Sequence, residues 1–128
     1  MHMPPSAFVI EDDPATSYIF QQVLSSLGLR VSSAGDGATA LEWLTHRPYD
    51  LILLDLLLPR VSGVELLKQC QQLEHLKQCP IVIVTAHSRM RCEIVLRPND
   101  HFLLKPVLLR DLYGLVSRLL PDCVPVTH

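Results

Sequence analysis

The 128 residues amount to about one ordinary domain, and a hydrophobic content of 48% is enough for a single enclosed core. The formal net charge of −2 gives no general electrostatic reason to bind nucleic acid or an anionic membrane. The longest apolar runs, such as residues 51–54, are far too short to span a bilayer, and residues 1–6 lack the apolar core of a signal peptide. We therefore expect a cytoplasmic protein without a membrane or nucleic-acid partner.

The cysteines indicate neither a metal centre nor a redox motif. They form no C-x-x-C pair and no cluster with histidine at the spacing of zinc ligands. We interpret them as reduced structural thiols. They are Cys70, Cys79, Cys92 and Cys123.

Five short runs rich in Val, Ile and Leu alternate with longer segments of helical period. This alternation is typical of a parallel sheet covered by helices. Right-handed crossovers then predict a doubly wound, flavodoxin-like α/β fold with five strands in the order 2-1-3-4-5. We expect this domain at residues 7–120, between a disordered segment at 1–6 and a tail at 121–128. The predicted strands are 7–10, 30–34, 51–54, 81–84 and 101–104.

The helical segments carry start and stop signals. Asp13 offers an N-cap before Pro14, and Gly28 can end the same helix in the left-handed conformation. Ser62 and Glu65 have the spacing of a capping box. Apolar stripes should face the core; they are Ile19, Val23 and Leu27, then Ala38, Leu41 and Leu44, then Val64, Leu67 and Cys70, and finally Leu108, Leu112, Leu115 and Leu119.

Reactive side chains follow or end four of the five predicted strands. Glu11 and Asp12 follow the first, Asp55 the third, Thr85 the fourth and Lys105 the fifth. Each has a simpler explanation by itself, as a cap, a strand residue or a surface charge. In a doubly wound sheet, however, the carboxyl ends of these strands lie side by side where ligands bind. Their joint occurrence therefore predicts one site.

The residue types at this predicted site suit phosphoryl chemistry with a divalent cation. Carboxylates in contact repel one another unless a cation lies among them, and oxygen ligands with few carboxylates suit Mg²⁺. The same ion would neutralise charge on a phosphoryl group in transit to Asp55, while Lys105 and Thr85 contact its oxygens. A carboxyl phosphate is reasonable covalent chemistry for an aspartate.

Over residues 7–120 the pattern resembles the receiver domain of bacterial two-component response regulators. The resemblance implies that Asp55 is the phosphoacceptor in a Mg²⁺-dependent reaction. It also implies that Asp12 binds Mg²⁺ directly, Glu11 through water, and Leu57 through its backbone carbonyl. The motifs that carry it are Glu11-Asp12, Asp55 with Pro59 and Gly63, Thr85-Ala86 and Lys105-Pro106.

The resemblance assigns further roles around the phosphoacceptor. Thr85 and Lys105 would hold the phosphoryl oxygens, and the peptide bond that follows Lys105 should be cis. Phe102 has the position of the switch aromatic that turns inward when Thr85 moves. Leu57 and His87 border the path of the hydrolytic water, so an apolar Leu57 should give a long-lived phosphorylated form.

The resemblance also implies partners. A sensor histidine kinase or a histidine phosphotransfer protein would supply the phosphoryl group, and a downstream effector protein would sense the switched conformation. The chain would be no enzyme beyond its own phosphorylation and slow dephosphorylation. A homodimer, the cognate kinase and membership of a larger regulator or hybrid kinase stay open.

The segment between Thr85 and Lys105 departs from the family pattern. It is shorter than expected, and 97–100 replaces the usual Gly-Ala before the last strand. We therefore expect a fourth helix that is short, irregular or mobile. Arg89, Arg91 and Arg97 make the segment basic, either as a solvated surface or as a docking site for an acidic partner.

Three other functions are compatible with such a fold. A degenerate receiver would act as an interaction module without phosphorylation, but then the complete set of site residues has no evident use. A haloacid-type phosphatase needs a second Asp two residues after the nucleophile, where this chain has Leu57. Flavin binding would need a loop rich in glycine and hydroxyl donors after the first strand, and residues 12–15 are acidic instead.

Overall fold

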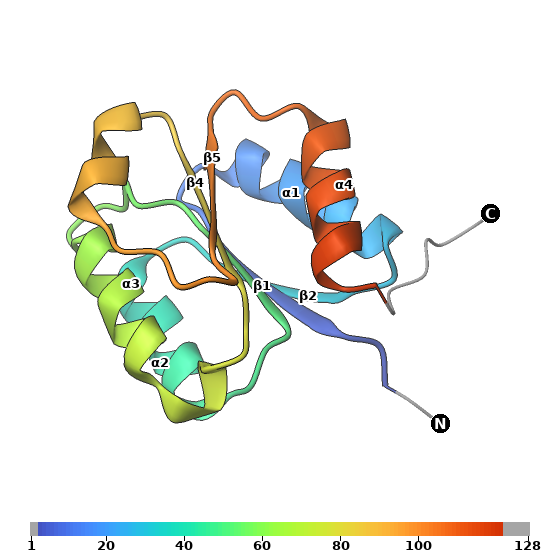
Figure 1. Ribbon diagram of the computed structural model, residues 1–128, viewed down its shortest axis with the longest axis horizontal. Coiled ribbons are helices and arrows are strands. Elements are labelled where there is room, and N and C mark those ends of the chain that lie inside the picture. Colours follow the sequence, from blue (N-terminus) through green and yellow to red (C-terminus); the bar gives the residue numbers. More distant parts are fainter. Residues whose placement is uncertain (1–2, 122–128) are drawn as a thin grey trace.

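The computed structural model describes residues 3–121, which form one parallel five-stranded sheet flanked by helices (Figure 1). The strand order is β2-β1-β3-β4-β5, which confirms the predicted doubly wound fold. Predictions for residues 1–2 and 122–128, including Cys123, lie outside the described residues. The strands are β1 (Ser6–Ile10), β2 (Arg30–Ala34), β3 (Leu51–Leu54), β4 (Ile81–Thr85) and β5 (His101–Leu104).

The first strand begins earlier than predicted. Ser6 belongs to β1, and the carbonyl of Pro5 accepts a hydrogen bond from the amide of Arg30 at 2.8 Å. Pairing with β2 thus orders residues that the sequence assigned to a disordered segment. The fourth strand extends by one residue, to Thr85.

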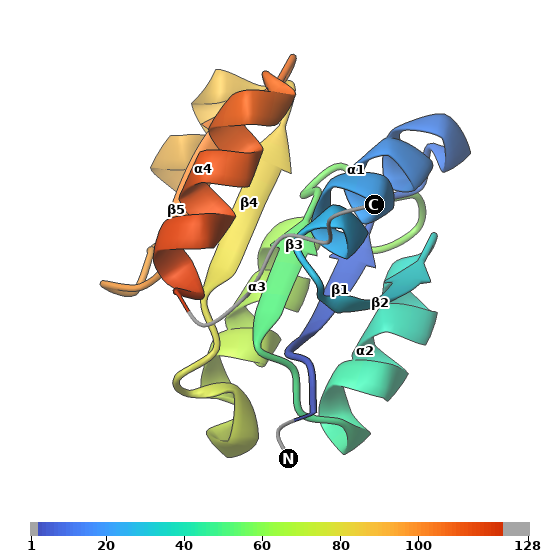
Figure 2. The ribbon, with the colours of Figure 1, turned by 90° about the vertical axis from the view of Figure 1, so that its right-hand side faces the viewer.

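Helices cover both faces of the sheet. The helices α2 (Gly37–His46) and α3 (Gly63–Gln72) pack on one face, and α1 (Pro14–Ser26) and α4 (Leu109–Leu119) pack on the other (Figure 2). Each face has its own apolar cluster, so the central strands β3 and β4 are buried on both sides. None of the helices described is long and apolar enough to cross a membrane.

Both predicted N-caps are present, although among the described residues the Glu65 side chain makes no hydrogen bond back to Ser62 and pairs with Lys68 instead. The Asp13 carboxylate accepts from the amide of Thr16 at 3.1 Å, and the Ser62 hydroxyl accepts from the amide of Glu65 at 3.3 Å. Gly28 ends α1 with a φ of 84°, a left-handed conformation that favours glycine. These local signals position both helices relative to the strands that precede them.

Several side chains of the predicted apolar stripes face solvent instead. Ile19 is 45% exposed, Leu108 is 54% exposed as the N-cap of α4, and Ala38 is exposed as well. In α1 the core face passes through Phe20 and Leu24. The chain has apolar residues on two neighbouring helical faces here, and packing between the sheet and α4 selects the one that includes Phe20.

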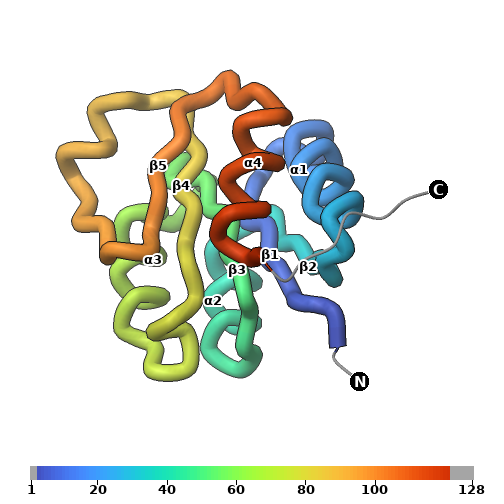
Figure 3. Tube along the Cα trace, turned by 45° about the vertical axis from the view of Figure 1, so that its right-hand side comes forward, coloured from blue at the N-terminus to red at the C-terminus, as the bar shows by residue number. Residues whose placement is uncertain are grey.

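The connection between β4 and β5 has no α-helix, in agreement with the predicted irregular fourth helix. It forms a 3₁₀ helix, η2 (Ser88–Glu93), in which no side chain is buried. Figure 3 shows this connection as a wide loop beside α3. A second short 3₁₀ helix, η1 (Glu74–Leu76), precedes β4.

A buried ion pair fixes the end of this connection. The Asp100 side chain is fully buried and accepts from the Arg97 Nε at 2.9 Å and from the Ile81 amide at 3.0 Å. Arg97 also donates to the carbonyls of Leu76 and Cys79, at 3.1 and 2.8 Å. We call this arrangement the Arg97–Asp100 clamp. Arg97 is therefore committed to the fold and does not belong to an exposed basic patch with Arg89 and Arg91.

Candidate functional site

The strand ends bring the predicted site residues to one edge of the sheet. Glu11 and Asp12 follow β1, and the Asp55 amide donates to the carbonyl of Ile10 at 3.0 Å, which holds the end of β3 beside them. The Lys105 amide likewise donates to the carbonyl of Thr85 at 2.8 Å. Backbone hydrogen bonds between the strands thus place these residues side by side without any contribution from their side chains.

The Lys105 ammonium joins two of the carboxylates. Its Nζ lies 2.5 Å from Glu11 Oε1 and 2.8 Å from Asp55 Oδ2. Burial favours the neutral amine, but the hydrogen bonds to Asp55 and Glu11 outweigh it and raise the pKa of Lys105. The lysine is therefore a permanent cation at neutral pH. The peptide bond between Lys105 and Pro106 is cis, as the resemblance implies.

Three carboxylates converge at the ends of β1 and β3. Ligand oxygens of Glu11, Asp12 and Asp55 all lie within 4.8 Å of one another. Glu11 and Asp55 are 3% and 6% exposed, whereas Asp12 faces solvent. Burial raises the pKa of Glu11, although the hydrogen bond from Lys105 opposes this rise. One ammonium balances only one of three carboxylates, so the donor set fits a hard divalent cation such as Mg²⁺.

The loop after β3 turns sharply beside Asp55. The Leu57 amide donates to Asp55 Oδ1 at 2.9 Å, while the Leu57 side chain is 41% exposed. A Cβ on Gly63 would lie 2.1 Å from the carbonyl oxygen of Leu56, so only glycine permits this close approach. This contact gives a physical reason for the glycine in the motif after Asp55.

Thr85 and Phe102 lie on the neighbouring strands β4 and β5, and neither makes a hydrogen bond to the acidic cluster. Thr85 is fully buried, and its Oγ accepts from the amide of His87 at 3.4 Å. Phe102 pairs in register with Ile83 and is half-buried against the α2–α3 side of the core. The His87 side chain is exposed. The structure therefore joins Glu11 and Asp55 through Lys105 and groups Asp12 with these two carboxylates, and it leaves Thr85, His87 and Phe102 without a hydrogen bond to the group.

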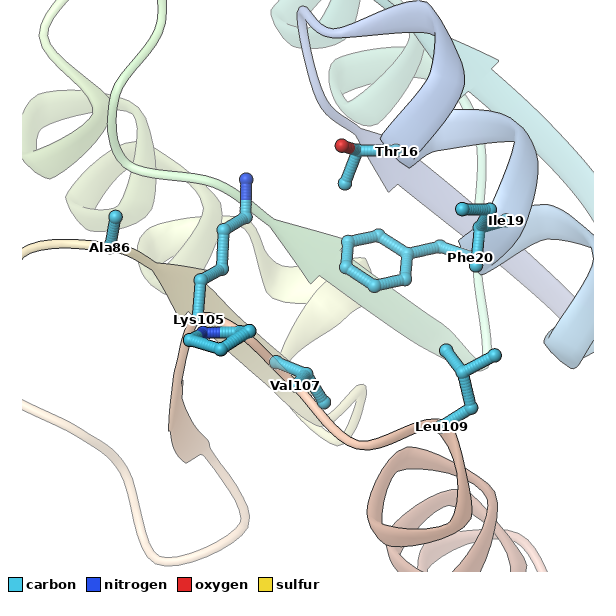
Figure 4. A pocket seen from close by; sticks show the side chains of 8 residues that line it. Thr16, Ile19, Phe20, Ala86, Lys105, Val107 and Leu109 are labelled. Carbon is cyan, nitrogen blue, oxygen red and sulfur yellow. The ribbon is translucent and has the colours of Figure 1, made fainter.

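Sequence reasoning missed an apolar pocket of about 540 Å³ beside Lys105. Figure 4 shows the Phe20 ring of α1 and the Lys105 side chain on facing sides of it, with Ile19 and Leu109 at its rim. Ile19 and Leu109 are 45% and 46% exposed. The signal in the sequence was the adjacent apolar pair Ile19 and Phe20, of which only one can face the core; the predicted stripe chose Ile19. We call this the α1–α4 pocket.

Comparison with known proteins gives consistent matches. The family model for the response regulator receiver domain matches residues 7–117. The two-component response regulator ORR11 of rice (Oryza sativa subsp. indica) is 32% identical over 121 residues, which are 92% of this chain and 82% of that protein. Sensor histidine kinase GacS of Pseudomonas protegens is 29% identical over 119 residues, but the chain spans only 13% of it.

Solved structures agree with these matches. The receiver domain of sensor histidine kinase PA1611 from Pseudomonas aeruginosa, with a magnesium ion coordinated in its active-site cleft, superposes with a TM-score of 0.81. It is 25% identical, and the alignment covers 94% of this chain and all of that one.

Proposed function

The chain belongs to the response-regulator receiver family, and from this premise we propose that Asp55 accepts a phosphoryl group and that partner proteins sense the resulting conformational switch. The observation that carries the proposal is the contact of Lys105 Nζ with both Asp55 and Glu11 inside a group of three carboxylates. The donor is a phosphohistidine on a sensor kinase or a phosphotransfer protein. The chain catalyses only its own phosphorylation and a slow dephosphorylation.

The transfer exchanges one bond for another. A carboxylate oxygen of Asp55 forms a bond to phosphorus, the bond between phosphorus and the donor imidazole nitrogen breaks, and the imidazole keeps the electron pair. Lys105 already contacts Asp55 Oδ2, so its ammonium is in place to stabilise charge on the incoming oxygens. The Leu57 amide steadies the other carboxylate oxygen of Asp55 at 2.9 Å.

Glu11, Asp12, Asp55 and the backbone carbonyl of Leu57 are the groups we assign to Mg²⁺, with Glu11 acting through water. When bound, the cation supplies positive charge that offsets the repulsion between the carboxylates and the phosphoryl oxygens. The burial of Glu11 and Asp55 supports this assignment, because buried carboxylates whose oxygens lie within 4.8 Å of one another need more compensation than one lysine supplies.

We assign the switch to Thr85 and Phe102. The Thr85 hydroxyl exchanges its contact with the His87 amide for a phosphoryl oxygen, and Phe102 moves inward from its half-buried position on β5. The new dianion favours this state by its contacts with Thr85 and Lys105. A downstream effector then recognises the altered surface formed by β5 and the β4–β5 connection.

The α1–α4 pocket is where we place the phosphohistidine donor. It adjoins Lys105, its rim is apolar, and exposed apolar side chains around a concave site suit a partner helix. Replacement of Ile19 with Glu should slow transfer from a phosphorylated histidine protein and leave phosphorylation by acetyl phosphate unchanged. Equal slowing with both donors would contradict this placement. Val95→Glu, at an apolar residue that is 82% exposed on the other side, serves as the matched control.

Intact mass spectrometry tests the central proposal. The chain is incubated with acetyl phosphate and Mg²⁺, and we expect a gain of one phosphoryl group that is lost without Mg²⁺ and in Asp55→Asn. A Glu74→Gln variant, altered at η1, should phosphorylate normally. An unmodified mass in the unaltered chain, together with no binding of Mg²⁺, would identify a phosphorylation-independent interaction module instead.

A further inference from the structure

Another pocket, lined by several polar side chains, lies at the edge of the sheet opposite Asp55, where the strands begin. Figure 2 shows β1 rising from this edge beside the lower end of α2. The cavity measures about 410 Å³ and is formed by the starts of β1 and β2 and by the loop before β3. We call it the amino-edge pocket, and its polar lining residues are Ser6, Arg30, Ser32, Arg47 and Tyr49.

Two guanidinium groups line this pocket without an acidic partner. Within residues 3–121, neither Arg30 nor Arg47 has a carboxylate oxygen within 4.0 Å. The Arg30 Nε donates to the carbonyl of Pro4 at 3.1 Å, which orients this side chain. Asp50, which precedes β3 at the same edge, accepts from the Ser6 amide at 2.8 Å. Two cations against one engaged carboxylate leave the pocket positive.

A stack of aromatic rings holds Arg47 in place. Its guanidinium carbon lies 4.2 Å from the centre of the Trp43 ring. Trp43 stacks on Phe8 at 5.7 Å, and Phe8 stacks on Tyr49 at 4.9 Å. A guanidinium held over an indole ring by a cation–π contact is positioned there and still has N–H groups that can donate to a planar or tetrahedral acceptor. Arg47 is thus oriented before any ligand arrives.

The Tyr49 hydroxyl provides an independent indication of an acceptor. It is buried, and no hydrogen-bond partner lies within 3.5 Å of it among the described residues, although Ser32 and Arg47 are near enough to lower its pKa as hydrogen-bonding neighbours. Buried hydroxyls without a partner are uncommon in folded proteins. Burial raises the pKa of Tyr49, so the hydroxyl keeps its proton and stays a donor at neutral pH. Ser32 and Arg47 lie beside it.

From these groups we propose that the amino-edge pocket binds a small oxyanion, the phosphate or carboxylate group of a soluble molecule, with Arg30 and Arg47 as its charge partners. Guanidinium forks match such groups in shape, and charge-assisted hydrogen bonds to them are the strong ones. The serine hydroxyls at the wall add neutral donors. The site is separate from Asp55 and does not depend on phosphorylation there.

Titration followed by ¹H–¹⁵N spectra tests the proposal with two probes, sodium phosphate and sodium acetate. The buffer contains no Mg²⁺, and sodium chloride keeps the ionic strength constant. We expect saturable shifts of the Ser6 and Ser32 amides with at least one probe, and a change in Trp43 emission as Arg47 engages the anion. Saturation by phosphate alone would assign the site to phosphate groups, and saturation by both would assign it to oxyanions in general.

Substitutions separate a built site from general electrostatics. Arg30→Gln removes one charge-assisted contact, worth roughly tenfold in affinity, and leaves Arg47 on its tryptophan. Arg47→Gln should weaken binding by a similar factor, and Arg110→Gln, an exposed arginine on α4, should not. Shifts that do not saturate, equal shifts with sodium chloride, an unchanged affinity in both pocket variants, or shifts confined to the Lys105 region would overturn the proposal.

Discussion

Replacement of Asp100 with Ala should destabilise the fold strongly. The Asp100 carboxylate accepts hydrogen bonds from Gln71 at 3.1 Å, from the Ile81 amide at 3.0 Å, and from Arg97 through its amide, Nε and Nη2, each at 2.9 Å. The substitution leaves the Arg97 charge only 19% exposed and without its counterion. Removal of one partner of a buried ion pair costs about 3–5 kcal/mol, against a total stability of roughly 5–15 kcal/mol.

Urea unfolding, followed by the emission of the single tryptophan and by circular dichroism, measures this loss. Glu42→Ala is the matched control, because its pair with His46 spans 3.6 Å between side chains that are 73% and 65% exposed. Such exposed pairs contribute about 0–1 kcal/mol. If Asp100→Ala lowers the free energy of unfolding no more than Glu42→Ala does, the Arg97–Asp100 clamp does not stabilise the β4–β5 connection.

The Asp100 carboxylate also makes the stability of the fold depend on pH. Burial alone would raise the pKa of Asp100, but hydrogen bonds from Arg97 and from backbone amides hold it below the ordinary value of 3.8. A lowered pKa in the folded state gives stability that is complete above the unfolded pKa and is lost as pH falls through the folded one. The difference between the unaltered chain and Asp100→Ala should therefore be constant near neutrality and shrink below about pH 4.

Three further predictions concern the proposed phosphorylation site. Gly63→Ala should lower the free energy of unfolding, measured with urea, by at least about 2 kcal/mol, because its Cβ would meet a carbonyl oxygen at 2.1 Å. Gly35→Ala is the control and should cost little, since the nearest contact of its Cβ would be at 3.9 Å. Equal losses of stability in the two variants would refute this reasoning. Asp12→Asn should weaken Mg²⁺ binding about tenfold or more in calorimetry, and Asp111→Asn should not. The half-life of the phosphoryl group on Asp55 should be minutes or longer. It should shorten in Leu57→Asn, because a polar side chain admits the hydrolytic water. A half-life of seconds in the unaltered chain would contradict this.

The sequence was sufficient to predict the sheet and the position of the site. Buried runs such as residues 51–54 predict strands because both faces of a parallel sheet are covered, and the strand order then places Asp55 beside Glu11 and Lys105. Caps such as Ser62 are local signals, which is why they could be predicted without knowledge of the fold.

Long-range packing explains what could not be predicted. Ile19 and Phe20 are adjacent apolar residues on α1, and packing of this helix against the sheet and α4 buries Phe20 and leaves Ile19 exposed. Arg97 appeared basic and exposed in the sequence because nothing local shows that Asp100 is buried three residues later. The α1–α4 pocket and the amino-edge pocket each depend on segments that meet only in the folded chain.

The missing helix between β4 and β5 has a consequence for local unfolding. Met90, Ile94 and Leu96 are the core contacts of this connection, and its 3₁₀ hydrogen bonds are weaker than those of an α-helix. Its amides should exchange with solvent hydrogen far faster than those of β4, because opening this segment breaks few contacts. We expect the Arg97–Asp100 clamp to confine such opening to the residues before it and so to leave the sheet intact.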